Sequence, residues 1–177
     1  MNKLALAAVL LAAPLAARAD LGLRVGGEAQ VAYHTADGTH VITDNWPLGL
    51  DAMISYWTPG SLLSIDVEVG EQFFLSAPAG AGSRLGTVLR PGVRISPPVL
   101  PIYIRGAIPI NVESPSPYDI GRGKYGLMLG AGITIPLVLF KVYIEADANF
   151  PLGGGTAAPD AFSNWALLLN GGLDFRF

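Results

Sequence analysis

Two histidines and two neighbouring carboxylates are the first candidates for chemistry in this chain. His34 and His40 are its only histidines, and Asp37 and Asp44 lie beside them. Imidazole and carboxylate groups can exchange protons or hold a divalent cation. Their spacing matches no fixed metal motif, however, and Asp37-Gly38 is a turn-forming pair. We therefore interpret residues 34–44 as a solvated loop, and we predict neither a metal nor a cofactor.

A second set consists of charged residues that alternate with apolar ones. Asp66 and Glu68, for example, lie between Ile65, Val67 and Val69. Successive side chains of a β-strand point to opposite faces, so alternation places such charges together on one face. The residues predicted to form this charged network, with a structural or a conducting role, are Glu28, Asp51, Asp66, Glu68, Arg90, Arg94, Arg105, Glu145 and Asp147.

The alternation that positions these charges recurs along the whole chain after residue 20. Eight segments have one apolar face and one polar or small face: 21–33, 45–56, 63–75, 84–95, 102–112, 124–135, 141–150 and 164–177. The connections between them are alternately long and short. Segments of about ten residues joined in this way are typical of membrane β-barrels, which have short periplasmic turns and longer external loops. The pattern predicts an all-β fold, an eight-stranded antiparallel up-and-down transmembrane β-barrel.

Composition and the first residues agree with an exported membrane protein. Only 14% of residues are charged and 51% are hydrophobic, whereas soluble domains carry about 25% charge. Lys3, the apolar run 4–13 and Ala17-Arg18-Ala19 indicate a signal peptide cleaved after Ala19. We predict residues 1–19 as this signal peptide and 20–177 as the barrel domain. Without Lys3 and Arg18, 9 basic residues face 14 acidic ones, which argues against nucleic acid as a partner.

The same alternation would suit a soluble, lipocalin-like periplasmic ligand-binding barrel with its apolar face inward. Three observations favour the membrane. Glu71 is the one ionised residue on the apolar faces. Many glycines occupy the polar faces, which suits a narrow interior. Aromatic residues lie where the apolar faces end, as in interfacial girdles: Tyr33, Trp46, Tyr56, Phe73, Tyr125, Phe150, Trp165 and Phe177.

The last strand carries a family resemblance. Phe177 is preceded by apolar residues at alternate positions back to Trp165, and this arrangement resembles the C-terminal strand of Gram-negative outer-membrane proteins. The mature chain is similar to the small eight-stranded barrels of the outer-membrane protein A and X type. The resemblance implies an outer-membrane location and recognition of the C-terminal strand by the barrel-assembly machinery. The chain also departs from that family, since no peptidoglycan-binding domain is expected after Phe177.

Pro91 lies within a predicted strand. It should break a ladder hydrogen bond, and we expect a bulge there.

The polar faces carry similar numbers of basic and acidic residues. Basic residues are predicted at Arg24, Arg84, Arg90, Arg94, Arg105, Lys124, Lys141 and Arg176, against Glu28, Asp51, Asp66, Glu68, Glu145, Asp147 and Asp174. Side chains just fill the interior of an eight-stranded barrel, so these groups should form buried ion pairs, Glu68 with Arg90 first among them. A plugged lumen is one interpretation. A narrow, porin-like channel for small solutes or ions is the other, since lumen-facing glycines could leave voids.

Catalysis is not expected. Some barrels of this class modify lipid A with a His and a Ser or carboxylate that face the membrane. By parity His34 faces the lumen here, and no outward serine lies near it. We therefore predict a non-enzymatic outer-membrane protein, a monomer in contact with outer-membrane lipids, that has a structural or surface-interaction role.

Overall fold

The computed structural model describes residues 20–35, 37–44, 46–57, 61–76, 83–97, 99–112, 125–153 and 164–177. The predicted signal peptide, residues 1–19, and Lys124 lie outside the described residues. Strand β1 begins at Asp20, the residue predicted to follow the cleavage site. Cleavage itself stays a prediction.

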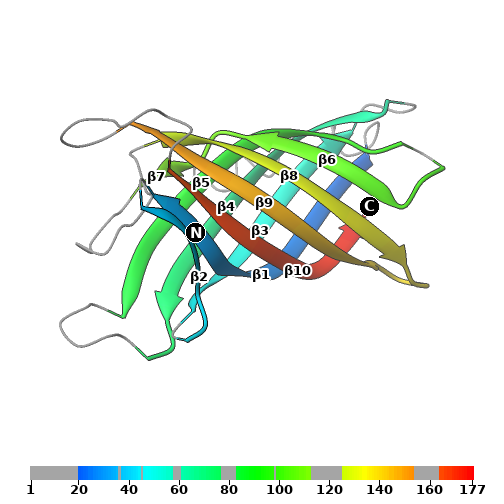
Figure 1. The fold of residues 1–177 in the computed structure, drawn as a ribbon. Coiled ribbons are helices and arrows are strands. Elements are labelled where there is room, and N and C mark those ends of the chain that lie inside the picture. Colours follow the sequence, from blue (N-terminus) through cyan, green and yellow to red (C-terminus); the bar gives the residue numbers. More distant parts are fainter. Residues whose placement is uncertain are drawn as a thin grey trace, which may run out of the picture.

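The described residues form one closed antiparallel barrel (Figure 1). Its strands are β1 (Asp20–Thr35), β2 (Gly38–Val41), β3 (Pro47–Trp57), β4 (Leu63–Phe74), β5 (Arg84–Ile95), β6 (Ile102–Ala107), β7 (Ile110–Asn111), β8 (Tyr125–Pro136), β9 (Lys141–Gly153) and β10 (Trp165–Arg176). β2 pairs with β1 in a short hairpin and is not a separate strand of the ring. β6 and β7 are two parts of one strand between β5 and β8. Pairing of β1 with β10 closes the ring, which has eight strands as predicted.

The two ends of the barrel differ. Asp20 pairs with Trp57, and the Phe177 amide donates to the Leu21 carbonyl at 2.9 Å. The first and last strands therefore meet at the end where β3 joins β4, β5 joins β6 and β8 joins β9. We call this the turn end. The opposite end, where β2 extends from β1, is the loop end.

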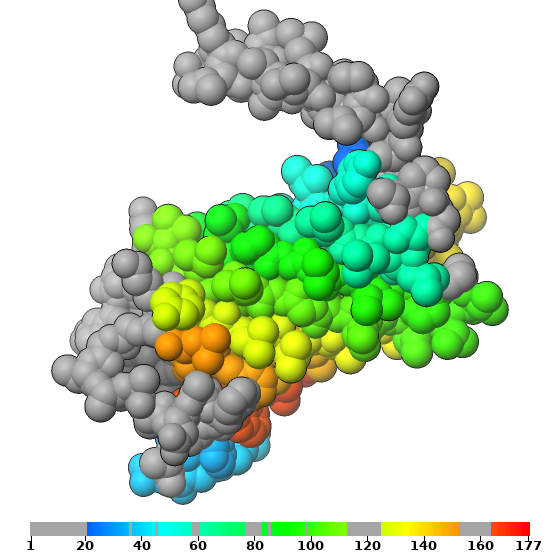
Figure 2. Space-filling model, turned by 90° about the horizontal axis from the view of Figure 1, so that it is seen from above, coloured from blue at the N-terminus to red at the C-terminus, as the bar shows by residue number. Residues whose placement is uncertain are grey.

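The polar faces point inward and the apolar faces outward. On β4, Ser64, Asp66 and Glu68 are buried, whereas Ile65 and Val69 are 59% and 49% exposed. Figure 2 shows this outer surface across neighbouring strands. A soluble lipocalin-like barrel needs the reverse arrangement, so that alternative is wrong. Among the described residues, no helix is long and apolar enough to cross a membrane.

Cysteine labelling can test this arrangement, because the chain contains no cysteine. Ala52 and Met53 on β3 pair with Val69 and Glu68 on β4, so Met53 and Val69 lie close in height. Met53 is 2% exposed and Val69 49% exposed. In refolded protein in vesicles, we expect Val69→Cys to react with a lipid-soluble maleimide. Met53→Cys should react only after unfolding. Rapid labelling of Met53→Cys in the folded barrel would contradict the assigned faces.

The bulge expected at Pro91 is absent. Pro91 pairs with Val67, and the register continues unbroken on both sides of this pair. In an antiparallel ladder the N–H and C=O of one residue point to the same neighbour. Because the Pro91 carbonyl accepts from the Ile108 amide at 2.9 Å, its missing N–H also faces β6 and β7. Proline therefore costs one hydrogen bond on that side, where Pro109 also lies between the two short strands, and leaves the β4 ladder intact.

Three irregularities in pairing do occur, all towards the loop end. The extra residue lies between Gln30 and Ala32 on β1, between Arg84 and Gly86 on β5, and between Pro151 and Gly153 on β9. On β5 the pairing skips one residue next to Gly86, whose φ of 134° is readily adopted only by glycine. Each bulge shifts the parity of the residues beyond it, so parity assignments fail at these strand ends.

Three predicted orientations are wrong for this reason. Arg84 was assigned to the lumen, but it pairs with Phe73 on the outer face and forms an ion pair with Glu71. His34 was also assigned to the lumen. It pairs with Trp165 and stacks on its ring at 5.5 Å, on the face opposite to buried Ala166 and Leu168. Tyr33, in turn, shares the face of Ala166 rather than the outward girdle.

The first predicted loop, residues 34–44, contains part of a hairpin. β1 continues to Thr35, and β2 pairs back onto it from Gly38, which has a φ of 120°. Tyr33 stacks on His40 across this hairpin at 5.0 Å. The predicted turn at Asp37-Gly38 thus joins two strands instead of lying within an irregular loop.

Candidate functional site

The inside of the barrel is the candidate site. Among the described residues, four arginines and seven carboxylates are buried there: Arg24, Arg90, Arg94, Arg105, Glu28, Asp51, Asp66, Glu68, Glu145, Asp147 and Asp174. We call this set the lumen network. It includes all nine residues named from the sequence, together with Arg24 and Asp174. Arg84, one of the basic residues assigned to the lumen, faces outward instead, whereas Lys141 and Arg176 lie at the turn end without being buried.

At mid-height, Glu68 is shared by two arginines. Arg90 on the adjacent strand forms the expected ion pair with Glu68, and its Nη2 also lies 2.7 Å from Oε2 of Glu28 on β1. Arg105 on β6 donates to the other Glu68 oxygen at 2.6 Å and to Asp66 Oδ1 at 3.0 Å. The ion pairs therefore connect β1, β4, β5 and β6 across the interior, where the alternative to pairing is an unpaired buried charge.

Nearer the turn end, Arg24 is the centre of a second cluster. It donates to Asp174 on the paired strand β10 and to Glu145 on β9, both at 3.1 Å. Its guanidinium also lies over the rings of Tyr103 and Tyr143, 4.5 Å and 4.4 Å from their centroids. The Tyr103 hydroxyl donates to Glu145 at 2.5 Å. Glu145 Oε1 lies 3.7 Å from Arg105, which joins this cluster to the one at mid-height.

Two buried carboxylates have hydrogen bonds but no ion pair within the part of the chain that the structure describes. Asp51 accepts from the Tyr143 hydroxyl at 3.1 Å, and Asp147 accepts from the Asn170 amide. One oxygen of each carboxylate has no hydrogen-bond partner. Both residues belong to the network named from the sequence, but within the described strands neither forms an ion pair with an arginine.

Tyr103, Tyr143 and Trp57 were missed as members of the site. Tyr103 and Tyr143 were on the predicted polar faces, but they were passed over because only charged residues were chosen. Trp57 has the same parity as Asp51 and Ser55, so alternation alone could have placed it inward. It is 4% exposed and lies 4.6 Å from Arg94 and 4.3 Å from Arg176, measured from its ring centroid.

Inward-facing glycines make room for these large side chains. A Cβ added at Gly49 would lie 2.5 Å from Glu28, and one at Gly22 would lie 2.6 Å from Trp57. An added Cβ at Gly130 would collide with Asp147, and one at Gly132 with Tyr103. The expectation that lumen-facing glycines leave voids is therefore wrong at these positions, since neighbouring side chains occupy the space.

The histidines considered for metal binding or catalysis make other contacts. His34 Nδ1 lies 2.8 Å from the Thr39 hydroxyl, and its ring stacks on Trp165. His40 stacks on Tyr33. The described residues contain no group of three or more histidine, cysteine or acidic residues placed to hold a metal ion.

Comparison with known proteins gives a match in fold. No family model and no curated protein matches the sequence. Among solved structures, the crystal structure of Neisserial surface protein A superposes with a TM-score of 0.58 at 10% identity, covering 89% of this chain and 97% of that one. At this identity the likeness concerns the fold alone: the chain has the architecture of a small eight-stranded outer-membrane barrel.

Proposed function

We propose that this chain is an outer-membrane protein whose closed barrel serves as a rigid, non-conducting anchor. In the outer membrane the proposed orientation places the turn end in the periplasm, and the loop end presents a surface for interaction outside the cell. The likeness of its fold to a protein named as a surface protein supports this assignment. The outward apolar faces supply the lipid contacts, and export would follow cleavage after Ala19.

The observation that carries a non-conducting lumen is the shared pairing of Arg90 and Arg105. These two arginines, 3% and 4% exposed, bind carboxylates on β1 and β4 and so fill the interior at mid-height. A conducting pore needs a continuous hydrated path. Here Arg90 and Arg105 are held in ion pairs with Glu28, Asp66 and Glu68. Side chains also occupy the space beside Gly49, Gly130 and Gly132.

Conductance measurement tests this proposal. Refolded protein, shown by gel mobility to be a compact, heat-modifiable barrel, is added to a planar lipid bilayer. We expect no steady single-channel current from the wild-type protein, because the ion-paired side chains block the interior. A stable unitary conductance from verified barrel would contradict the closed lumen and favour the narrow channel for small solutes or ions.

We further infer a non-enzymatic role, on a narrower basis than the sequence suggested. His34 does not face the lumen, so its predicted position away from a lipid substrate no longer supports this role. The remaining support is its environment. It contacts the Thr39 hydroxyl and the Trp165 ring, and among the described residues no carboxylate hydrogen-bonds to its ring as one does in catalytic triads.

The last strand supports two further parts of the proposal. On β10, Leu169 faces outward and Phe177 follows the strand with 76% of its surface exposed. We propose that the assembly machinery recognises this strand during insertion. Closure of the barrel by β1 and β10 leaves no unpaired edge between them that would require a second subunit, and we propose a monomer.

A further inference from the structure

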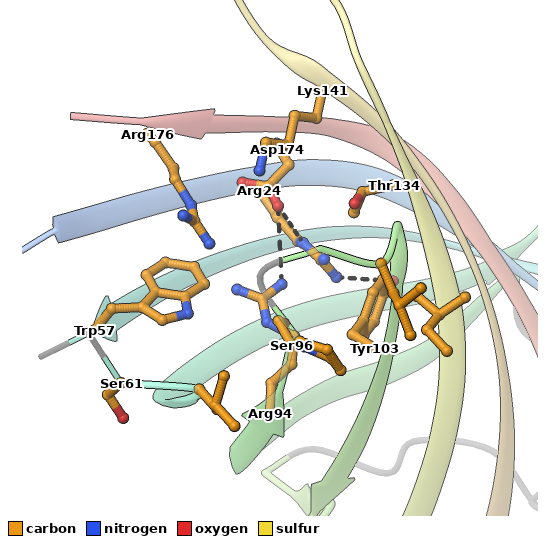
Figure 3. Close-up of a pocket in the computed structure, with 14 residues that line it drawn as sticks. Arg24, Trp57, Ser61, Arg94, Ser96, Tyr103, Thr134, Lys141, Asp174 and Arg176 are labelled. Atoms are coloured by element: carbon orange, nitrogen blue, oxygen red, sulfur yellow. Dashed lines mark hydrogen bonds and ion pairs between the residues drawn. The ribbon is translucent and has the colours of Figure 1, made fainter. Parts of the chain in front are cut away.

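A cavity at the turn end contains more positive charge than its walls neutralise. It has a volume of about 400 Å³ and is lined by strand residues and by Ser61, Ser96 and Pro97 from the turns. Its charged lining residues are Arg24, Arg94, Lys141, Arg176 and Asp174, four cations against one carboxylate. Even when Glu145, which pairs with Arg24, is counted, two positive charges remain in excess. Figure 3 shows these side chains converging on the cavity.

Arg94 has fewer anionic partners than the other buried arginines. It is 1% exposed, and its Nε and Nη2 donate to the hydroxyls of Ser64 and Ser55 at 3.4 Å and 3.1 Å. Among the described residues its one ion pair joins Nη1 to Asp174 at 3.8 Å, and Asp174 also binds Arg24 at 3.1 Å. Nη1 therefore lies near Asp174, but it is buried and makes no hydrogen bond. A buried guanidinium N–H group that makes no hydrogen bond lowers the stability of the folded protein, unless a ligand accepts a hydrogen bond from it.

A second buried donor without a hydrogen bond lies beside Arg94. The indole N–H of Trp57 is also buried without a hydrogen-bond partner, and its ring lies between Arg94 and Arg176. At the rim, Lys141 is half-buried and Arg176 is exposed. No ion pair is recorded for either among the described residues. The cavity thus combines two buried donors that make no hydrogen bond with two rim cations, an arrangement that attracts a multiply charged oxyanion.

We propose that this cavity is a binding site for the phosphate group of a small molecule or of a lipid headgroup entering from the turn end. A guanidinium presents N–H donors in a planar fork that matches phosphate oxygens. In the proposed complex, Arg94 Nη1 and the Trp57 indole donate to the phosphate oxygens, and Lys141 and Arg176 supply charge at the rim. This inference does not depend on whether the lumen above the cavity conducts.

The test uses pyrophosphate as the probe and Trp57 as the reporter. The chain has three tryptophans, so Trp46→Phe/Trp165→Phe leaves Trp57 alone in the full-length barrel. Refolded protein in non-ionic detergent is titrated with pyrophosphate while potassium chloride holds the ionic strength constant, because exposed charges are screened by salt. We expect a saturable change in Trp57 emission.

Rim variants in the same background test the site without disturbing the buried network. Lys141→Gln/Arg176→Gln should raise the dissociation constant by about tenfold or more, since both charges that attract the anion at the rim are removed. Arg84→Gln is the matched control, because Arg84 lies on the outer face at the opposite end of β5, and it should leave the constant unchanged. Gel mobility confirms that each variant is folded.

A parallel measurement in nanodiscs distinguishes the two sources of the phosphate group. Discs of phosphatidylcholine alone are compared with discs that contain phosphatidic acid. A response to pyrophosphate assigns a soluble ligand, and a response only to phosphatidic acid assigns a headgroup. Absence of a saturable response to both probes, or equal responses in the rim and control variants, would overturn the proposal.

Discussion

Replacing Arg90 by alanine is expected to lower the free energy of unfolding by about 3–5 kcal/mol. Arg90 is 3% exposed and is the ion-pair partner of both Glu28 and Glu68. Removing it leaves Glu28 buried without a cation and Glu68 with Arg105 alone. Urea unfolding of the refolded protein in vesicles, followed by tryptophan fluorescence and by the gel shift of the folded barrel, gives the change in midpoint.

Arg84→Ala is the matched control for this measurement. Arg84 also pairs with a glutamate of β4, Glu71, but the two side chains are 51% and 40% exposed. Exposed ion pairs contribute about 0–1 kcal/mol, so this variant should unfold close to wild type. A double variant, Arg90→Met/Glu28→Gln, should recover part of the loss because it removes one stranded carboxylate as well. Equal midpoints for Arg90→Ala and Arg84→Ala would contradict a stabilising lumen network.

Replacing Gly132 by valine is expected to cost about 3 kcal/mol or to prevent folding. Gly132 lies on the inward face of β8, and an added Cβ would collide with the Tyr103 ring and lie 2.7 Å from the Ile144 carbonyl oxygen. The ring is held in place by the hydrogen bond from its hydroxyl to Glu145 and by Arg24. The backbone carbonyl belongs to the β8–β9 ladder and cannot retreat without breaking it. The yield of heat-modifiable barrel and its urea midpoint measure the effect.

Gly106→Val provides the control on the neighbouring strand. Gly106 pairs with Leu129 and faces outward, and its added Cβ would meet only a Leu129 methyl group at 3.9 Å. Valine suits a lipid-facing strand position, so this variant should fold like wild type. If both valine variants were equally stable, the interior at Gly132 would have to contain free space, and the case for a filled lumen would weaken.

Most of the architecture was predictable from alternation alone. On β4, the regular exchange of Ser64, Asp66 and Glu68 with Ile65, Val67 and Val69 is enough to define a strand with two different faces. Because each membrane strand repeats this two-residue period, the sequence predicts eight segments, their approximate limits and the side of each that meets lipid. The Glu68–Arg90 ion pair was predictable because strands that follow each other in the chain are antiparallel neighbours in this fold, so residues on their inward faces lie opposite each other.

The residues assigned to the wrong face of a strand lie at the loop end. A bulge inserts one residue into one strand and reverses the parity of everything beyond it. That single step placed Arg84 and His34 on the wrong face. Gly86, with its positive φ, was a signal that could have indicated one bulge. At Pro91 the reverse happened: a residue that suggested a bulge needs none, since its missing donor faces the interruption between β6 and β7.

The sequence by itself determined the barrel, the charged interior and the apolar exterior, because these depend on a local period that each strand carries independently. Only the tertiary structure decided which charges are neutralised. Arg24 reaches Glu145 and Asp174 on strands far along the chain, and Asp51 and Asp147 form no ion pair with an arginine among the described residues. Arg94 keeps a donor without a hydrogen bond beside Trp57. Those differences arise from closure of β1 onto β10 and from the positions of side chains across a narrow interior, and no pattern within a single strand specifies them.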